Sequence, residues 1–131
     1  MGNNKFNSSA ITGAFHELAL FTGLSSIGSV RGSKFTGITV PEGVTSIGTS
    51  TFENCSYLVV VNLPSTITSL GNMAFYNCPS MSLTILAATP PTRGTGSYTL
   101  PGYGTIYVPA GSVDAYKEAW SGYASRIQAI P

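Results

Sequence analysis

The chain has 131 residues, a length that suits one domain with a buried core. Charged residues make up only 8% of it and the formal net charge is +1, so the clustered Lys and Arg that nucleic-acid binding requires are missing. It contains no run of about 18 apolar residues, so we expect no membrane insertion. Its polar surface must consist of Ser, Thr, Asn and Gly, a composition common in secreted β-proteins.

The first part of the chain predicts a flexible start followed by an imperfect repeat. Residues 1–13 are polar and are expected to fray. Residues 14–37 are interpreted as a degenerate N-terminal repeat, because Gly23–Gly28 echoes Gly43–Gly48. Terminal repeats are atypical because one of their faces meets water. We therefore predict that Ala14–Leu20 forms a short helix covering the open end.

Two full repeats follow, and they carry the same pattern at an offset of 23 residues. Residues 38–60 read ITVPEGVTSIGTSTFENCSYLVV, and residues 61–83 read VNLPSTITSLGNMAFYNCPSMSL. Self-similarity at such a period indicates stacked supersecondary units. Each unit is predicted to hold an extended run closed by Pro, such as Leu58–Pro64, and a second short extended run, such as Val44–Ile47. The segment that carries the Phe should turn as a brief helical loop.

Stacking places equivalent side chains of the repeats in rows. Phe52 and Phe75 are expected to form one row in the core, and Phe35, Leu58 and Met81 another. An Asn ladder, Asn54 with Asn77, is expected to satisfy backbone groups of a buried turn, because an Asn side chain both donates and accepts hydrogen bonds.

Cys55 and Cys78 occupy equivalent positions and are predicted to be small core fillers. Adjacent coils would place their Cα atoms about 5 Å apart, within range of a disulfide. Equivalence, however, makes their Cα–Cβ bonds nearly parallel, so the Cβ atoms would also stay about 5 Å apart rather than the roughly 3.5–4.5 Å that a bridge prefers. We predict two free thiols.

The remaining chain is interpreted as a degenerate repeat with a loop, residues 84–108, and a C-terminal cap, residues 109–131. A one-residue deletion that aligns Leu83 with Val61 and Ile85 with Leu63 fits the apolar pattern. Pro and Gly predict a loop over Thr89–Gly96, and Ile106–Pro109 is predicted as the last strand. Ser112 should cap a helix that runs through Trp120, with one apolar face formed by Val113, Tyr116 and Trp120.

These motifs, above all the repeated VTSIG, F-x-NC and LP elements and the closing IYVPAGSVDAYKEAW, resemble the BspA-type leucine-rich-repeat family of bacterial surface proteins. The resemblance implies a β-rich (α/β) solenoid, a short leucine-rich-repeat coil stack with a strand-lined concave side and a helical C-terminal cap. It also implies an extracellular or cell-surface location and binding to host or matrix proteins. It supplies no catalytic residues.

The exposed side of the strand row is the candidate partner-binding surface. Small polar and β-branched side chains alternate there with inward apolar ones, which suits a protein or a surface glycan. The predicted contact residues are Thr36, Gly37, Thr39, Val59, Val60, Asn62, Ser82 and Thr84.

Catalytic, metal and cofactor sites are not expected. His16 is the only histidine and is interpreted as a polar residue on the first helix; a zinc site needs three or four ligands. The loop of Gly94–Gly96, with Tyr98 and Tyr103, lacks the context of a phosphate cradle, and its tyrosines are predicted to pack onto the last coil. The carboxylates are scattered over different repeat positions: Glu17, Glu42, Glu53, Asp114 and Glu118.

The leading hypothesis is a non-enzymatic surface module of adhesin type that binds a partner through the strand row. One alternative is a structural cap or spacer of a larger adhesin or of a tail-fibre-like assembly. A remote alternative is a glycan-directed hydrolase that uses the tyrosine loop and the scattered carboxylates.

Overall fold

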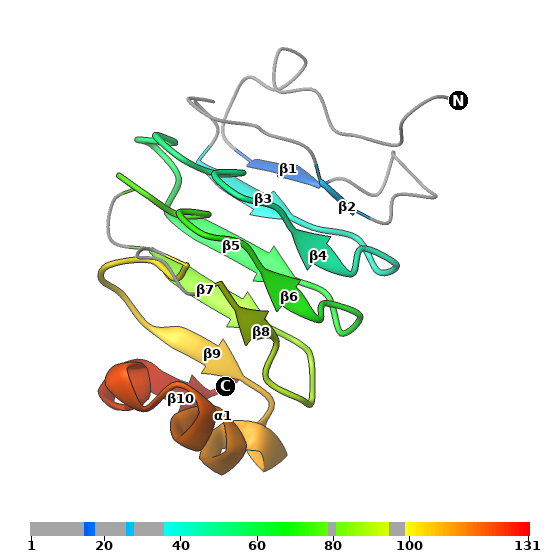
Figure 1. Cartoon of the computed structure of the whole chain (residues 1–131), viewed down its shortest axis with the longest axis vertical. Coiled ribbons are helices and arrows are strands. Elements are labelled where there is room, and N and C mark those ends of the chain that lie inside the picture. The colour runs from blue at the N-terminus through cyan, green and yellow to red at the C-terminus, as the bar shows by residue number, and fades with distance from the viewer. Residues whose placement is uncertain (1–14, 18–25, 28–35, 79–80, 95–98) are drawn as a thin grey trace.

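The computed structural model describes residues 15–17, 26–27, 36–78, 81–94 and 99–131. Short strands alternate with turns over most of this part, and one α-helix lies near the C-terminus (Figure 1). In chain order the elements are β1 (Phe15–Glu17), β2 (Ser26–Ile27), β3 (Gly37–Thr39), β4 (Ser46–Ile47), β5 (Val60–Leu63), β6 (Ser69–Leu70), β7 (Ser82–Ile85), β8 (Thr92–Arg93), β9 (Ile106–Val108), η3 (Ala110–Ser112), α1 (Val113–Ala119), η4 (Ser121–Arg126) and β10 (Ile127–Ala129).

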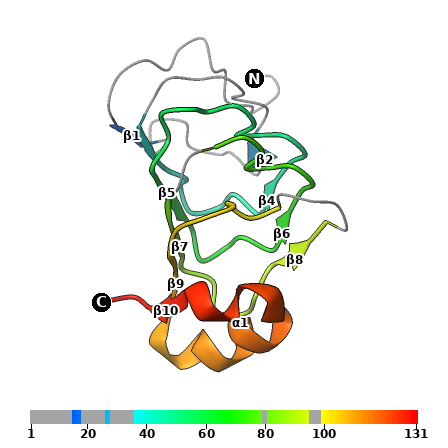
Figure 2. The same cartoon turned by 90° about the vertical axis from the view of Figure 1, so that its left-hand side faces the viewer.

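The strands form two parallel sheets. In the described part of the chain the first sheet has six strands in the order β1-β3-β5-β7-β9-β10, and the second has four in the order β2-β4-β6-β8. From β1 to β9, successive strands thus alternate between the sheets, so that each strand pairs with its counterpart one coil away; β10 joins the six-stranded sheet directly beside β9. Figure 2 shows the six-stranded sheet along one side of the molecule and the four-stranded sheet along the other.

The register of the sheets follows the repeat. Ser26 pairs with Ser46 and Ile27 with Ile47, as the echo between Gly23–Gly28 and Gly43–Gly48 predicts. The predicted one-residue deletion is also confirmed, because Leu83 pairs with Val61 and Ile85 with Leu63. A one-residue slip would have turned the apolar residues of β7 outward, so the alternation of buried side chains determines the pairing.

The core lies between the two sheets and consists of rows of aliphatic side chains. Within the six-stranded sheet, consecutive strands contribute one row whose members are at most 2% exposed, Ile38, Val61, Leu83, Ile106 and Ile127. Full burial of one such side chain stabilises the fold by about 1.5–3 kcal/mol. The rows are therefore the main source of stability.

The predicted Phe row is confirmed. Phe52 and Phe75 are 0% and 1% exposed, and their rings stack with centroids 5.3 Å apart and an interplanar angle of 17°. Phe35 lies outside the described residues, whereas Leu58 and Met81 of its predicted row are both buried in the core.

The Asn ladder exists, but its predicted purpose is wrong. The amide of Asn77 donates to Oδ1 of Asn54 at 2.8 Å, yet both side chains are exposed rather than buried in a turn. Their φ angles are +62° for Asn54 and +61° for Asn77. Asn tolerates this left-handed conformation better than most residues, and the tight turn before each Cys requires it.

A glycine lies where two coils approach each other closely. A Cβ on Gly71 would lie 2.6 Å from the carbonyl carbon of Gly48 and from the backbone nitrogen of Thr49. No side chain fits at that separation, so the backbone packing of the two coils requires Gly at position 71, after β6.

Both cysteines are free thiols in the structure. Cys55 is fully buried, and Cys78 is half-buried, with its sulfur 3.0 Å from the carbonyl oxygen of Phe52. Burial, together with the neighbouring Cys55, raises the pKa of the Cys78 thiol to about 12. Only the thiolate is a nucleophile, so Cys78 should be poorly reactive at neutral pH.

Thiol titration tests this prediction. In denaturant without reductant, two groups per chain should react. In the native protein at pH 8, Cys78 should be labelled on the order of 10³-fold more slowly than free cysteine, whose pKa is about 8.5. No titratable thiol after denaturation would mean that the two coils are bridged.

The C-terminal segment covers the end of the stack (Figures 1 and 2). Tyr116 and Trp120 are 0% and 2% exposed and contact each other edge to face, with ring centroids 5.0 Å apart. The Tyr116 hydroxyl donates to the carbonyl of Ala87 at 2.8 Å, and burial raises its pKa. Among the described residues, no helix is long and apolar enough to cross a membrane.

The helix prediction holds except at its ends. Helix α1 stops at Ala119, one residue before the predicted end. Ser112 occupies the N-cap position, but its side chain makes no capping bond. Its hydroxyl donates instead to the carbonyl of Ala88 at 2.7 Å, because the turn before α1 lies against the preceding coil.

Three strands contradict the sequence-based predictions. Residues Phe15–Glu17, with His16, form β1 rather than a helix, because pairing with β3 outweighs local preference. Strand β8 lies within the predicted loop Thr89–Gly96: the prolines precede it, and its register is held by the backbone N–H of Thr92, which donates to Thr68 at 2.9 Å. Strand β9 is not the last, since β10 pairs beside it.

Candidate functional site

The outer face of the six-stranded sheet brings the predicted contact residues together. In β5 and β7, half-buried residues alternate with buried ones. Thr39, Asn62 and Thr84 are register partners on three consecutive strands, and the Asn62 amide donates to Oγ1 of Thr39 at 3.1 Å. These side chains therefore form one continuous column, here called the outer column.

The other predicted residues lie beside this column. Val60 of β5 and Ser82 of β7 are register partners, each two residues before the column residue of its strand, and both are half-buried. Val59, which is 44% exposed, lies just before β5, and its N–H donates to the carbonyl of the half-buried Thr36 at 2.8 Å. Gly37 departs from the prediction, because it is buried.

The column extends further than the sequence indicated. Tyr107 of β9 pairs with Thr84, and Gln128 of β10 pairs with Tyr107. Tyr107 is half-buried and Gln128 is exposed. The alternation in Ile106-Tyr107-Val108 contains the signal for Tyr107. Gln128 was missed because β10 follows a helix and has no counterpart in the repeats.

Tyr103 lies at the rim where β7 and β9 begin and is 76% exposed, so the prediction that it packs onto the last coil is wrong. Tyr98 lies outside the described residues. The loop around Tyr103 is nevertheless held in place. The Arg126 guanidinium donates to the carbonyls of Gly104 at 2.7 Å and Pro101 at 2.8 Å, so the backbone is fixed while the ring points to solvent.

From β3 to β10 the chemistry of the outer column is neutral. Its side chains there carry hydroxyls, amides and a phenol, and Val60 beside it adds an aliphatic group, so the surface can form hydrogen bonds and apolar contacts. Among the carboxylates, Glu17 of β1 is the register partner of Thr39 and so stands at the β1 end of the column. Glu42 and Glu53 are on turns, and Asp114 and Glu118 are on α1. In the described part of the chain, no three His, Cys, Asp or Glu residues gather in a way that could hold a metal ion. The arrangement suits recognition of a surface.

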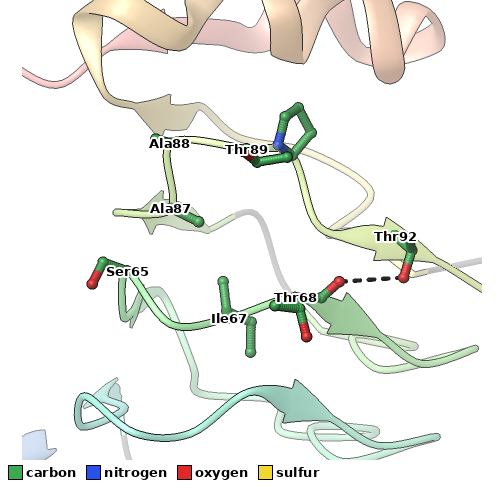
Figure 3. A pocket seen from close by; sticks show the side chains of 8 residues that line it. Ser65, Ile67, Thr68, Ala87, Ala88, Thr89 and Thr92 are labelled. Atoms are coloured by element: carbon green, nitrogen blue, oxygen red, sulfur yellow. Dashed lines mark hydrogen bonds between the residues drawn. The ribbon is translucent and has the colours of Figure 1, made fainter.

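A second feature, which the sequence did not reveal, is a groove at the corner where the six-stranded sheet leads into the four-stranded one (Figure 3). Its volume is about 430 Å³, and it lies between the connection from β5 to β6 and the connection from β7 to β8. The lining residues are Ser65, Ile67, Thr68, Ala87, Ala88, Thr89, Pro90 and Thr92.

The groove has a local cause. The connection from β3 to β4 is tied to the next one, from β5 to β6, by hydrogen bonds. The carboxylate of Glu42 accepts one from the hydroxyl of Ser65 at 2.6 Å and one from the Ser65 N–H at 2.9 Å, and these bonds lower the pKa of Glu42. The connection of residues 86–91 is one residue longer than that of residues 64–68. Its Ala87 and Ala88 carbonyls are bound by Tyr116 and Ser112, toward the C-terminal segment. The connections therefore separate and leave the groove open.

Comparison with protein families gives one match. The family model described as a BspA type leucine-rich repeat region, in six copies, matches residues 19–110. A comparison with curated proteins finds no match for the chain.

Proposed function

Because this chain belongs to the BspA-type leucine-rich-repeat family, we propose that it is a non-enzymatic protein-binding module of a cell-surface or secreted bacterial protein. Leucine-rich repeats serve in general as protein-interaction modules, and repeats of this type are typically associated with surfaces. In this proposal the chain is a short solenoid of coils of about 23 residues, closed by residues 109–131, that binds its partner in the manner of an adhesin.

One observation supports the proposal most directly: from β3 to β10 the outer column is continuous and uncharged. Thr39, Asn62, Thr84, Tyr107 and Gln128 lie on five consecutive strands. A regular face of this kind presents hydrogen-bonding groups at the strand spacing of about 4.8 Å. The cores of protein interfaces are likewise poor in charged residues and rich in Tyr. We therefore propose a host or matrix protein as the partner, with a surface glycan as the alternative.

A charge placed in the column should disrupt binding. We expect Asn62→Arg and Thr84→Arg each to raise the Kd at least about 10-fold, because an arginine without a partner would be desolvated at the centre of the interface. Ala115→Arg is the matched control, since Ala115 is exposed on α1 and the substitution adds the same charge. Biolayer interferometry against immobilised collagen, fibronectin and laminin, with a glycan array in parallel, measures the effect.

The outcomes separate the partner classes. Protein binding that both column variants weaken and Ala115→Arg preserves supports the proposal, whereas binding only on the glycan array favours the alternative partner. Failure to bind any immobilised protein, or binding that the column variants leave unchanged, contradicts it. All variants must first show the parent melting temperature.

A structural role is the second candidate function. It is favoured by the way α1 covers the end of the stack, with Tyr116 and Trp120 buried against the last coil. A chain with this role would be a terminal cap or spacer within a larger adhesin or a tail-fibre-like assembly. The column variants would then have no effect on any binding.

A further inference from the structure

Arg93 occupies a position that the repeat otherwise fills with an aliphatic residue. On the four-stranded sheet, Arg93 is the register partner of Leu70, which in turn pairs with Ile47. Ile47 and Leu70 are 1% and 2% exposed, whereas Arg93 is half-buried. A cation thus stands at the end of an apolar row, where its partial desolvation costs free energy unless other groups compensate.

Among the described residues, the groups that contact Arg93 are two aromatic rings and a hydroxyl, which carry no formal negative charge. Its guanidinium lies over the rings of Tyr123 and Trp120, 5.2 Å and 5.8 Å from their centroids, and one N–H donates to the hydroxyl of Thr99 at 3.1 Å. Cation–π contacts of this kind stabilise a cation by about 0.5–2 kcal/mol. The carbonyl end of α1 at Ala119 adds only partial negative charge, so the site keeps a net positive charge.

A hollow of about 370 Å³ opens beside this cation, between β8 and the C-terminal end of α1. Strand β8 is the last strand of its sheet in the described part of the chain, and Figures 1 and 2 both show α1 next to it. The hollow is lined by Pro91, Thr92, Arg93, Gly94, Ala119 and Trp120, among other residues. Of the described residues that line it, Arg93 is therefore the one with an ionised side chain.

We propose that this hollow binds a carboxylate carried by an acidic peptide segment of a partner protein, with Arg93 as the anchor. A guanidinium has five N–H donors in a planar fork that matches a carboxylate, and the hydrogen bond to Thr99 uses one of them. Charge complementarity selects the occupant: a neutral ligand leaves the desolvated cation uncompensated, and a basic one is repelled. The site lies apart from the outer column, so it does not depend on the function proposed above.

The chain contains a built-in reporter for this hollow. Trp120 is the only tryptophan, it lines the hollow, and its ring lies against the Arg93 guanidinium. Fluorescence excited selectively at tryptophan, which leaves out the seven tyrosines, therefore reports on the surroundings of Trp120. The probes are acetyl-Ala-Glu-Ala-amide and its uncharged counterpart acetyl-Ala-Gln-Ala-amide, with sodium acetate to separate a peptide from a small carboxylate.

We expect the Glu peptide to change the Trp120 fluorescence saturably, with a Kd at least 10-fold lower than that of the Gln peptide and of acetate. Raising the salt concentration from about 0.05 M to 0.5 M should weaken binding, because screening shortens the reach of the charge. Equal Kd values for the two peptides, or no saturable change, would overturn the proposal. An equal response to acetate would overturn the assignment to a peptide.

Two variants locate the effect. Arg93→Leu continues the row of Ile47 and Leu70, so it should fold while losing the preference for Glu over Gln. Lys117→Gln is the matched control, because it removes the same charge from an exposed position on α1 and should keep the preference. If Arg93→Leu does not fold, Arg93→Lys retains a charge without the fork and should lower the preference several-fold. A preference that survives loss of the guanidinium contradicts the anchor role.

Discussion

Phe52→Ala is expected to destabilise the protein by roughly 3–5 kcal/mol, and Phe75→Ala by a similar amount. Each ring fills a position that is at most 1% exposed, and the two stack at 5.3 Å, so each truncation leaves a cavity in a row shared by adjacent coils. Domains of ordinary stability unfold with about 5–15 kcal/mol, and either variant therefore approaches the unfolding limit. Urea denaturation followed by circular dichroism gives the change.

The control for this experiment is Tyr57→Ala. Tyr57 is 57% exposed, and its loss should change the free energy of unfolding by no more than about 0.5 kcal/mol. Because the two rings touch, the double variant should lose less than the sum of the single changes. A Phe variant that melts within one or two degrees of the parent would show that the rings do not share a core row.

Deletion of residues 110–131 is expected to cause aggregation. The segment covers Ile106, Val108 and Ala87, each at most 3% exposed, and it supplies β10, the partner of β9. Without it β9 becomes a sheet edge beside bare apolar side chains, the arrangement that recruits other chains. It also leaves the carbonyls of Ala87 and Ala88 without the hydroxyls of Tyr116 and Ser112.

Size-exclusion chromatography with light scattering measures the outcome. The deleted chain should elute as large species or precipitate. Removal of the exposed Pro131 alone should leave the elution profile unchanged. A soluble, monomeric chain without residues 110–131 would contradict the view that this segment closes the stack.

The middle of the chain could be predicted from sequence because a strict period carries two kinds of information at once. It indicates which residues are equivalent, as with Phe52 and Phe75, and it determines which strand faces which. The shift at Leu83 was predictable for the same reason, since only one register keeps Leu83 and Ile85 inside. Three residues of the outer column and two beside it follow from that alternation: Thr39, Asn62 and Thr84 in the column, and Val60 and Ser82 beside it.

The ends were less predictable because their structure depends on contacts that have no copy in the repeat. Strands β1, β8 and β10 have two or three residues each, too few for a periodic signal, and they form because a neighbouring strand offers hydrogen bonds. The exposure of Tyr103 depends on how Arg126 holds its loop. The corner groove and the place of Arg93 arise from a single added residue and from the C-terminal segment, which no pattern within the repeat anticipates.

The hydrogen bonds between the central coils suggest how a chain of this kind can change in length over evolution. Gly43 to Thr66, Asn62 to Thr39, and Asn77 to Asn54 each join residues that are 23 positions apart, so a coil contacts mainly the coils on either side. Duplication of one whole unit would give the new coil the same kind of neighbouring coil on each side, so hydrogen bonds of this kind would form again. A single inserted residue is tolerated only in a connection between strands, as in residues 86–91. Within a strand it would turn the buried side chains that follow it to the solvent face. Growth by complete units is therefore the nearly neutral path, and the C-terminal end, which residues 109–131 close, is the part least free to vary.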